Sequence, residues 1–173
     1  LSEGVHYTRN VKKYALRLAI GMLLAEYPFD CLFFGGWTWA HQSVMVTLLL
    51  ACLALTAMTR AQEAWCKLLI ALPFAVAAEL LHTDYGAVGV LMCVMFALTR
   101  TLPNRIAIQS VLLLVLCFLA GGYTFALGPI QIPIECFGVF AMLPIACYRG
   151  YKCTRSRIVQ VAFYLFYPVH LTL

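Results

Sequence analysis

Long apolar runs alternate along this chain with short connections that carry Gly, Pro and charged residues. Each run has about 15 residues or more, and only helices or closed barrels satisfy every backbone polar group inside a bilayer. Runs of this length therefore predict helices. The seven predicted spans are residues 14–28, 42–59, 68–82, 85–99, 106–127, 130–148 and 158–173.

The connections between the runs set the predicted boundaries. The first run is expected to stop at Pro28, since proline disrupts a helix interior. A Gly- and Trp-rich connection then covers residues 29–40. No internal repeat or separate soluble domain is visible. The pattern predicts an all-α fold, a polytopic transmembrane helical bundle that forms one domain over residues 1–173.

Composition supports this class and excludes others. Hydrophobic residues make up 64% of the chain and charged residues 11%, against about 25% charged in a typical soluble domain. Such a chain has too little polar surface for a soluble enzyme and too much apolar character for disorder. The eight cysteines contain no CxxC pair, and most lie inside apolar runs. We expect them to pack as small hydrophobic residues.

The basic residues divide the chain into two sides. When the connections are numbered alternately, all 12 Lys and Arg fall on one side, which the positive-inside rule makes cytoplasmic. The net charge of +5 then indicates contact with acidic membrane lipids and not with nucleic acid. The basic residues are Arg9, Lys12, Lys13, Arg17, Arg60, Lys67, Arg100, Arg105, Arg149, Lys152, Arg155 and Arg157.

Histidines and carboxylates gather at the opposite ends of the spans. His170 lies about 18 Å into the last run, at 1.5 Å per residue, which is past the bilayer midplane. Ionisable groups at such depth are costly and are expected to face a polar cavity. The others are Glu26, Asp30, His41, Glu79, His82, Asp84 and Glu135.

Each group allows a functional and a structural interpretation. Glu26 and Asp30 are one helical turn apart and either share a site or act as helix caps. Glu79, followed by His82 and Asp84, either orients a general base or belongs to a solvated turn. His170 follows a proline-distorted segment and is either a reactive base or a histidine bonded to a neighbouring carbonyl.

Two further sets of residues also allow a functional and a structural interpretation. A metal held by His41, His82 and His170 with Asp84 has no supporting ligand spacing, so no metal is expected. Basic residues near the start either fix the topology alone or bind the phosphates of an acyl-CoA. This basic set comprises Arg9, Lys12, Lys13 and Arg17.

Several strings of the chain resemble the TraX family, in order and over nearly the whole length. The resemblance implies a multi-span membrane acyltransferase of the bacterial cytoplasmic membrane that uses acyl-CoA, in a family named for a conjugal-transfer protein that N-acetylates pilin. The matching strings are Ser2-Glu3-Gly4, residues 6–14 with Arg17, residues 26–30, His41-Gln42-Ser43-Val44 with residues 47–49, Ala78-Glu79, residues 83–86 with Gly89, and residues 166–170.

This sequence also departs from the family pattern in two ways. Family members carry two more hydrophobic segments before the Ser-Glu-Gly string, the first with an Asp-His pair thought to be catalytic. We therefore expect this sequence to be an N-terminally incomplete piece. Ser43 stands where the family usually has Asn.

Together these observations predict transfer of an acyl group, expected to be acetyl, from cytosolic acyl-CoA to an amine or hydroxyl at the outer face. The expected acceptor is a cell-envelope component such as a pilin-like peptide or a glycan. The alternatives are a proton- or cation-coupled membrane transporter and a non-catalytic scaffold. The expected catalytic residues are His170, Asp84 and Glu79, the acceptor-binding residues Glu26, Asp30, His41 and Gln42, and the donor-binding residues Arg9, Lys12 and Arg17.

Overall fold

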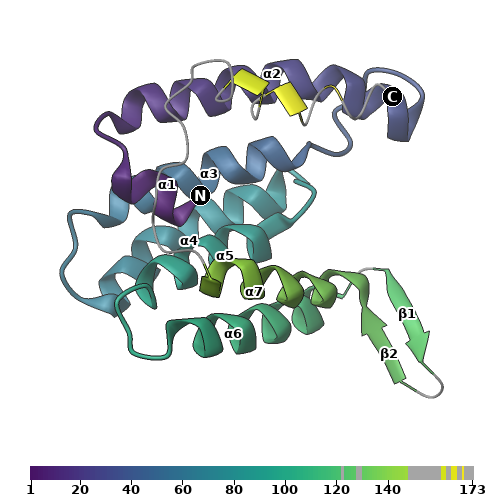
Figure 1. Cartoon of the computed structure of the whole chain (residues 1–173). Coiled ribbons are helices and arrows are strands. Elements are labelled where there is room, and N and C mark those ends of the chain that lie inside the picture. The colour runs from purple at the N-terminus through teal and green to yellow at the C-terminus, as the bar shows by residue number, and fades with distance from the viewer. Residues whose placement is uncertain (122, 128–129, 148–160, 163–164, 167–168, 170–173) are drawn as a thin grey trace. The chain divides into compact units, whose positions relative to one another are not determined.

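A computed structural model describes residues 1–121, 123–127, 130–147, 161–162, 165–166 and 169. The described chain is mostly helical (Figure 1), so the prediction of a predominantly α-helical protein is confirmed. The chain divides into two compact units. Unit 1 comprises Leu1–Val94 and Lys152–Leu173, and unit 2 comprises Met95–Tyr151.

Unit 1 begins with α1 (Ser2–Tyr7) and the long helix α2 (Val11–Phe34). Asn10 caps α2, because its side-chain oxygen accepts a hydrogen bond from the Lys13 N–H at 3.0 Å. The predicted stop at Pro28 is wrong, since α2 continues through it. Proline removes one backbone donor, but the apolar sequence persists on both sides. The helix ends instead at Gly35, whose φ of 72° is readily adopted only by glycine.

Three further helices follow close to their predicted positions. They are α3 (Val44–Met58), α4 (Ala64–Leu80) and α5 (Gly86–Leu98). In unit 1, α3 lies between α2 and α4 (Figure 1). Each chain reversal brings alternate connections to the same end of the unit, as the sequence pattern predicts.

Small residues allow these helices to pack closely. The buried residues of α4 are Ala71, Ala75 and Ala78, which share one helical face. On α2, a Cβ atom added at Gly21 would lie 2.6 Å from the Met45 methyl group, so only glycine fits there without a shift. Close approach of backbones through small residues is typical of helices that pack in membranes.

Unit 2 contains the end of α5, then α6 (Arg105–Ala120), strands β1 (Thr124–Leu127) and β2 (Ile130–Pro133), the 3₁₀ helix η1 (Ile134–Ala141) and α7 (Met142–Cys147). The strands are antiparallel, with Thr124 opposite Pro133. The buried Gln109 amide donates to the Phe96 carbonyl at 3.2 Å and to the Thr99 hydroxyl oxygen at 3.3 Å. These bonds join α6 to the end of α5.

The hairpin corrects two predicted spans. The runs 106–127 and 130–148 do not form single helices, because α6 ends at Ala120 and two strands follow. Gly121, with φ 70° and ψ −137°, takes a conformation that no helix continues. Ile130 and Ile132 favour extended backbone, and Pro133 ends the second strand. Apolar character alone did not distinguish this hairpin from a helix.

Among the residues that the structure describes, no helix combines the length and the apolar character required to cross a membrane. Most of the predicted seventh span, 158–173, lies outside the described residues.

Candidate functional site

Two connections of unit 1 meet at one end of its helices, which we call the polar end. They are the end of α2 with residues 35–43 and the turn at residues 79–87. A short parallel bridge joins them at Gln42 and Thr83. The Gln42 N–H donates to the His82 carbonyl at 3.1 Å, and the Asp84 N–H donates to the Gln42 carbonyl at 2.9 Å. These backbone bonds hold the connection before α3 against the turn after α4.

Glu26 links α2 to the beginning of α3. Its carboxylate accepts a hydrogen bond from the Ser43 hydroxyl at 2.8 Å and longer ones from the Ser43 N–H at 3.3 and 3.4 Å. Ser43 is buried and directly precedes α3. A carboxylate at a helix N-terminus is stabilised by the unpaired N–H groups and the helix dipole. The Ser43 hydroxyl thus donates to Glu26 at the position where the resemblance gives asparagine as the usual residue.

Asp30 lies one helical turn beyond Glu26 and is completely buried, with 0% of its surface exposed. Its Oδ2 accepts a hydrogen bond from the Thr38 N–H at 3.0 Å. Its Oδ1 has no hydrogen-bond partner within the described residues. A buried oxygen of this kind is costly, and such costs concentrate at sites that bind a proton, a cation or a substrate donor.

Two exposed histidines, His41 and His82, lie in the two connections that the bridge joins. The rings of His41 and His82 have centroids 6.3 Å apart at an interplanar angle of 69°. The Phe34 ring stacks on His41 with centroids 6.2 Å apart. His82 has φ 49°, an uncommon conformation for a non-glycine residue, and backbone strain of this kind is often found at functional sites.

Glu79 has a clear structural contact. Its Oε2 accepts a hydrogen bond from the Ala87 N–H at 3.0 Å, in the first turn of α5. Gly86 has φ 47°, and a Cβ atom there would lie 2.6 Å from the same oxygen. The Glu79 carboxylate therefore caps α5, and the missing side chain of Gly86 leaves space for it. Asp84 is exposed in the same turn.

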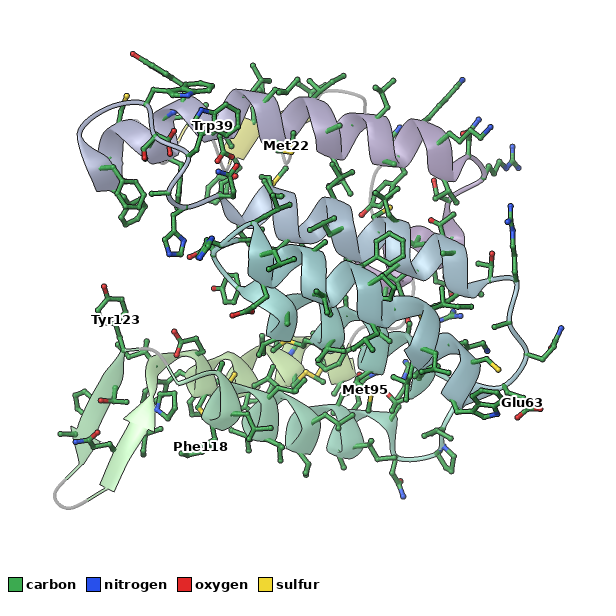
Figure 2. All side chains as sticks on the ribbon, turned by 180° about the vertical axis from the view of Figure 1, so that it is seen from behind. Met22, Trp39, Glu63, Met95, Phe118 and Tyr123 are labelled. Carbon is green, nitrogen blue, oxygen red and sulfur yellow. The ribbon has the colours of Figure 1, made fainter. Side chains whose placement is uncertain are left out.

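The predicted donor-binding residues lie at the other end of unit 1, which we call the basic end. Arg9, Lys12 and Arg17 are exposed at the start of α2. Figure 1 shows that α2 begins at the end where α3 connects to α4, the connection that carries Arg60 and Lys67. Figure 2 shows Trp39 and Glu63 at opposite ends of these helices. Lys12 and Glu26 are separated by about 21 Å along α2.

Two predicted residues are outside the described part of unit 1. His170 lies outside the described residues, so its predicted catalytic role is untested. Glu135 belongs to unit 2. In the described ranges, no group of three or more His, Cys, Asp or Glu could hold a metal ion.

The sequence did not identify three buried hydroxyl residues at the polar end. Ser43 binds Glu26, and a serine directly before an apolar run is a recognisable helix-start signal. Thr47 and Thr83 are also buried, and their hydroxyl oxygens have no hydrogen-bond partner in the described part of the chain. Nothing in the local pattern distinguishes these threonines from packing residues.

Comparison with known proteins agrees with the strings quoted above. The family model described as TraX protein matches residues 1–173, the whole chain. The chain is 31% identical over 186 residues to a protein of Dichelobacter nodosus named probable fimbrial assembly protein FimC, serogroup H1, and the match covers 100% of this chain and 74% of that protein. No solved structure matches. The chain belongs to the TraX protein family.

Proposed function

We propose that this protein is an acyltransferase of the bacterial cytoplasmic membrane, which moves an acetyl group from cytosolic acetyl-CoA to an amine or hydroxyl at the outer face. The observation that carries the proposal is the separation, within unit 1, of exposed cations at the basic end from carboxylates and histidines at the polar end. Membership of the TraX family supports the same reading.

The basic end would bind the donor. Arg9 lies just before α2, and Lys12 and Arg17 lie in its first two turns. All three are exposed, so their charges can reach the phosphates of a CoA molecule. The long pantetheine arm would then extend toward the polar end. The apolar helices between the two ends would keep water from the thioester.

The polar end would bind the acceptor and carry the reaction. Glu26, Asp30, His41 and Gln42 would hold the acceptor, and His170 would remove the proton from its amine or hydroxyl. The freed electron pair attacks the thioester carbonyl, and the CoA thiolate leaves. Asp84, which is exposed in the α4–α5 turn, and Glu79 are the candidates to orient the histidine, although Glu79 already caps α5.

The acceptor would be a component of the cell envelope. The Dichelobacter relative is named as a probable fimbrial assembly protein. A pilin-like peptide is therefore the first acceptor to test, with envelope glycans as the second.

The orientation can be tested by labelling from outside the cell. Single cysteines at positions 37 and 63, in a background with all eight native cysteines replaced by Ser, mark the two ends of unit 1. We expect a membrane-impermeant maleimide to label position 37 and to spare position 63. The reverse pattern would contradict the proposal, because it exchanges the donor and acceptor sides.

The reaction itself is tested by mass spectrometry of envelope peptides and glycans from cells with and without the gene. We expect at least one component to lose an acetyl group when the gene is deleted. Purified protein should also be stabilised against heat by acetyl-CoA.

A proton- or cation-coupled transporter is the second candidate, and the buried Oδ1 of Asp30 favours it. Proteoliposomes containing the protein and a pH-sensitive dye distinguish the two functions. Proton flux without any effect of acetyl-CoA would support the transporter and contradict the transferase.

A further inference from the structure

The last turns of α2 and the connection that follows expose aromatic side chains and no charge. Asp30 is the only Asp, Glu, Lys or Arg among residues 27–40, and it is fully buried. An exposed apolar patch of this kind marks an interaction surface. The large apolar side chains that this segment exposes are Tyr27, Leu32, Phe33, Phe34, Trp37 and Trp39.

Hydrogen bonds fix the backbone that carries the two tryptophans. The Oδ2 of Asp30 accepts a hydrogen bond at 3.0 Å from the N–H of Thr38, the residue between them. The Thr38 hydroxyl oxygen accepts a further one from the Ala40 N–H at 3.1 Å. The rings of Trp37 and Trp39 meet edge to face, with centroids 5.7 Å apart at an interplanar angle of 79°. A buried carboxylate thus positions an exposed pair of rings at the polar end, where Figure 2 labels Trp39.

The chemistry of the ring pair suits the headgroup layer of a membrane. An indole combines a large apolar body with one N–H donor, and Trp and Tyr are enriched at that layer. A sugar ring would need polar side chains around the aromatic rings. Thr38 is the only Ser, Thr, Asn or Gln among residues 27–40, and its hydroxyl already accepts a hydrogen bond.

The charges of unit 1 point to the same partner. Residues 27–40 expose no Asp, Glu, Lys or Arg, whereas the exposed cations Arg9, Lys12 and Lys13 lie at the basic end. Acidic lipids give the cytoplasmic leaflet a negative surface that attracts such cations. A surface with cations at one end and uncharged aromatic rings at the other complements the two sides of a bilayer.

We propose that Trp37 and Trp39 anchor the polar end of unit 1 in the headgroup layer of the membrane and that Asp30 is the positioning residue of this anchor. The proposal rests on the membrane location in the proposed function and not on acyl transfer. The headgroup layer is hydrated, so a cysteine at position 37 can still react from outside. The anchor would keep the carboxylates and histidines of the polar end at the membrane surface.

The test is fluorescence quenching of the purified full chain in vesicles of brominated phosphatidylcholine, because bromine quenches tryptophan at short range. The chain has three tryptophans, so Trp65→Phe leaves the ring pair as the only indole fluorophores. We expect lipids brominated near the headgroup to quench the pair about twice as strongly as lipids brominated near the chain ends, since Trp prefers the headgroup level.

Two variants in the Trp65→Phe background test the role of Asp30. Asp30→Ala should abolish the difference between the two lipids, because the Thr38 N–H loses its acceptor. Asp30→Asn keeps a carbonyl oxygen for that N–H and should restore the difference. If Asp30→Ala does not fold, Thr38→Pro removes the donor of the same bond and should have the same effect. An unchanged difference in the folded variant would overturn the positioning role.

A matched variant, Trp37→Phe with Trp39→Phe, separates the anchor from the membrane location. It leaves only Trp65, which is exposed at the start of α4. Quenching of Trp65 without any quenching of the ring pair would overturn the anchor and leave the membrane location intact. The absence of quenching at all three positions would contradict the membrane location itself. A fluorescence change of the unquenched pair on adding envelope oligosaccharides would show that the rings bind sugar instead, which also overturns the anchor.

Discussion

The two ends of α2 hold their charges in different ways. At its start, Arg9, Lys12 and Arg17 are exposed, and the Arg17 guanidinium carbon lies 5.7 Å from the centre of the Tyr14 ring. Near its end, Asp30 is fully buried and Glu26 is half-buried, and both carboxylates accept backbone N–H groups of the following segment.

In the proposed function, this difference separates two kinds of binding site. A carboxylate fixed by backbone donors has already lost its conformational freedom during folding, so it can meet a reacting group in one geometry. Exposed Lys and Arg side chains keep their rotamers and can follow a flexible polyphosphate. Changes at the polar end are therefore expected to affect both stability and reaction, and changes at the basic end to affect binding alone.

The largest effect is expected at His170. The replacement His170→Gln keeps the size and hydrogen bonding of the side chain but removes its basicity. Transfer should fall about 100-fold or more, within the usual range for loss of a general base, while expression and acetyl-CoA binding stay normal. Initial rates of acetyl transfer measure this. The matched control is His6→Gln on the exposed face of α1, which should retain full activity.

If His170→Gln retained full activity, His41 and His82 would be the next candidates for the base within this sequence. Their rings lie 6.3 Å apart at the polar end. The same replacement at each of these positions would then identify which one acts.

Asp30 should dominate the stability of the polar end. Asp30→Ala leaves the Thr38 N–H without its acceptor, and we expect a loss of about 1–3 kcal/mol in the free energy of unfolding. Asp30→Asn keeps a carbonyl oxygen for Thr38 and should lose less. Denaturant unfolding in detergent measures both. Equal stability of Asp30→Ala and the native chain would show that the buried contact is not formed.

The Glu26–Ser43 contact predicts a smaller, coupled effect. Glu26→Gln and Ser43→Ala each remove part of one hydrogen-bond network, so the double variant should lose less than the sum of the two single losses. We expect a coupling energy of about 1 kcal/mol in a double-mutant cycle. Additive losses would mean that Glu26 does not hold the beginning of α3.

The smallest effect is expected at the basic end. Replacing Lys12 and Arg17 by Gln should weaken acetyl-CoA binding about fivefold, or about 1 kcal/mol, because exposed charges are screened by solvent. The melting temperature should not change. Calorimetric titration measures the affinity, and Arg60→Gln with Lys67→Gln serves as the matched control. If the affinity for acetyl-CoA did not change in the α2 variant, Lys12 and Arg17 would not bind the donor and would act only in setting the topology.

The sequence predicted the two ends but not their contacts. Alternating turns are enough to bring residues 26–43 and 79–87 to one end, because consecutive helices reverse direction. The bonds from Glu26 to Ser43 and from Glu79 to Ala87 join positions whose spacing carries no signal. They depend on how the helices pack.

The local errors have equally specific causes. Pro28 alone predicts a helix stop, but the apolar sequence around it continues and α2 ends only before Gly35. The residues of the β1–β2 hairpin are as apolar as those of α6, so the apolar pattern predicts helix there, and Gly121 is the local signal that the helix ends.

The bridge between Gln42 and Thr83 has a consequence for hydrogen exchange. The Gln42 N–H donates to the His82 carbonyl, and the Asp84 N–H donates to the Gln42 carbonyl. Both hydrogen bonds join the same two connections, so both break when the connections separate. The two amides should therefore exchange deuterium at matching rates, as one cooperative opening unit. A ligand that binds at either connection would slow exchange at both, which makes this amide pair a reporter of acceptor binding that requires no knowledge of the acceptor.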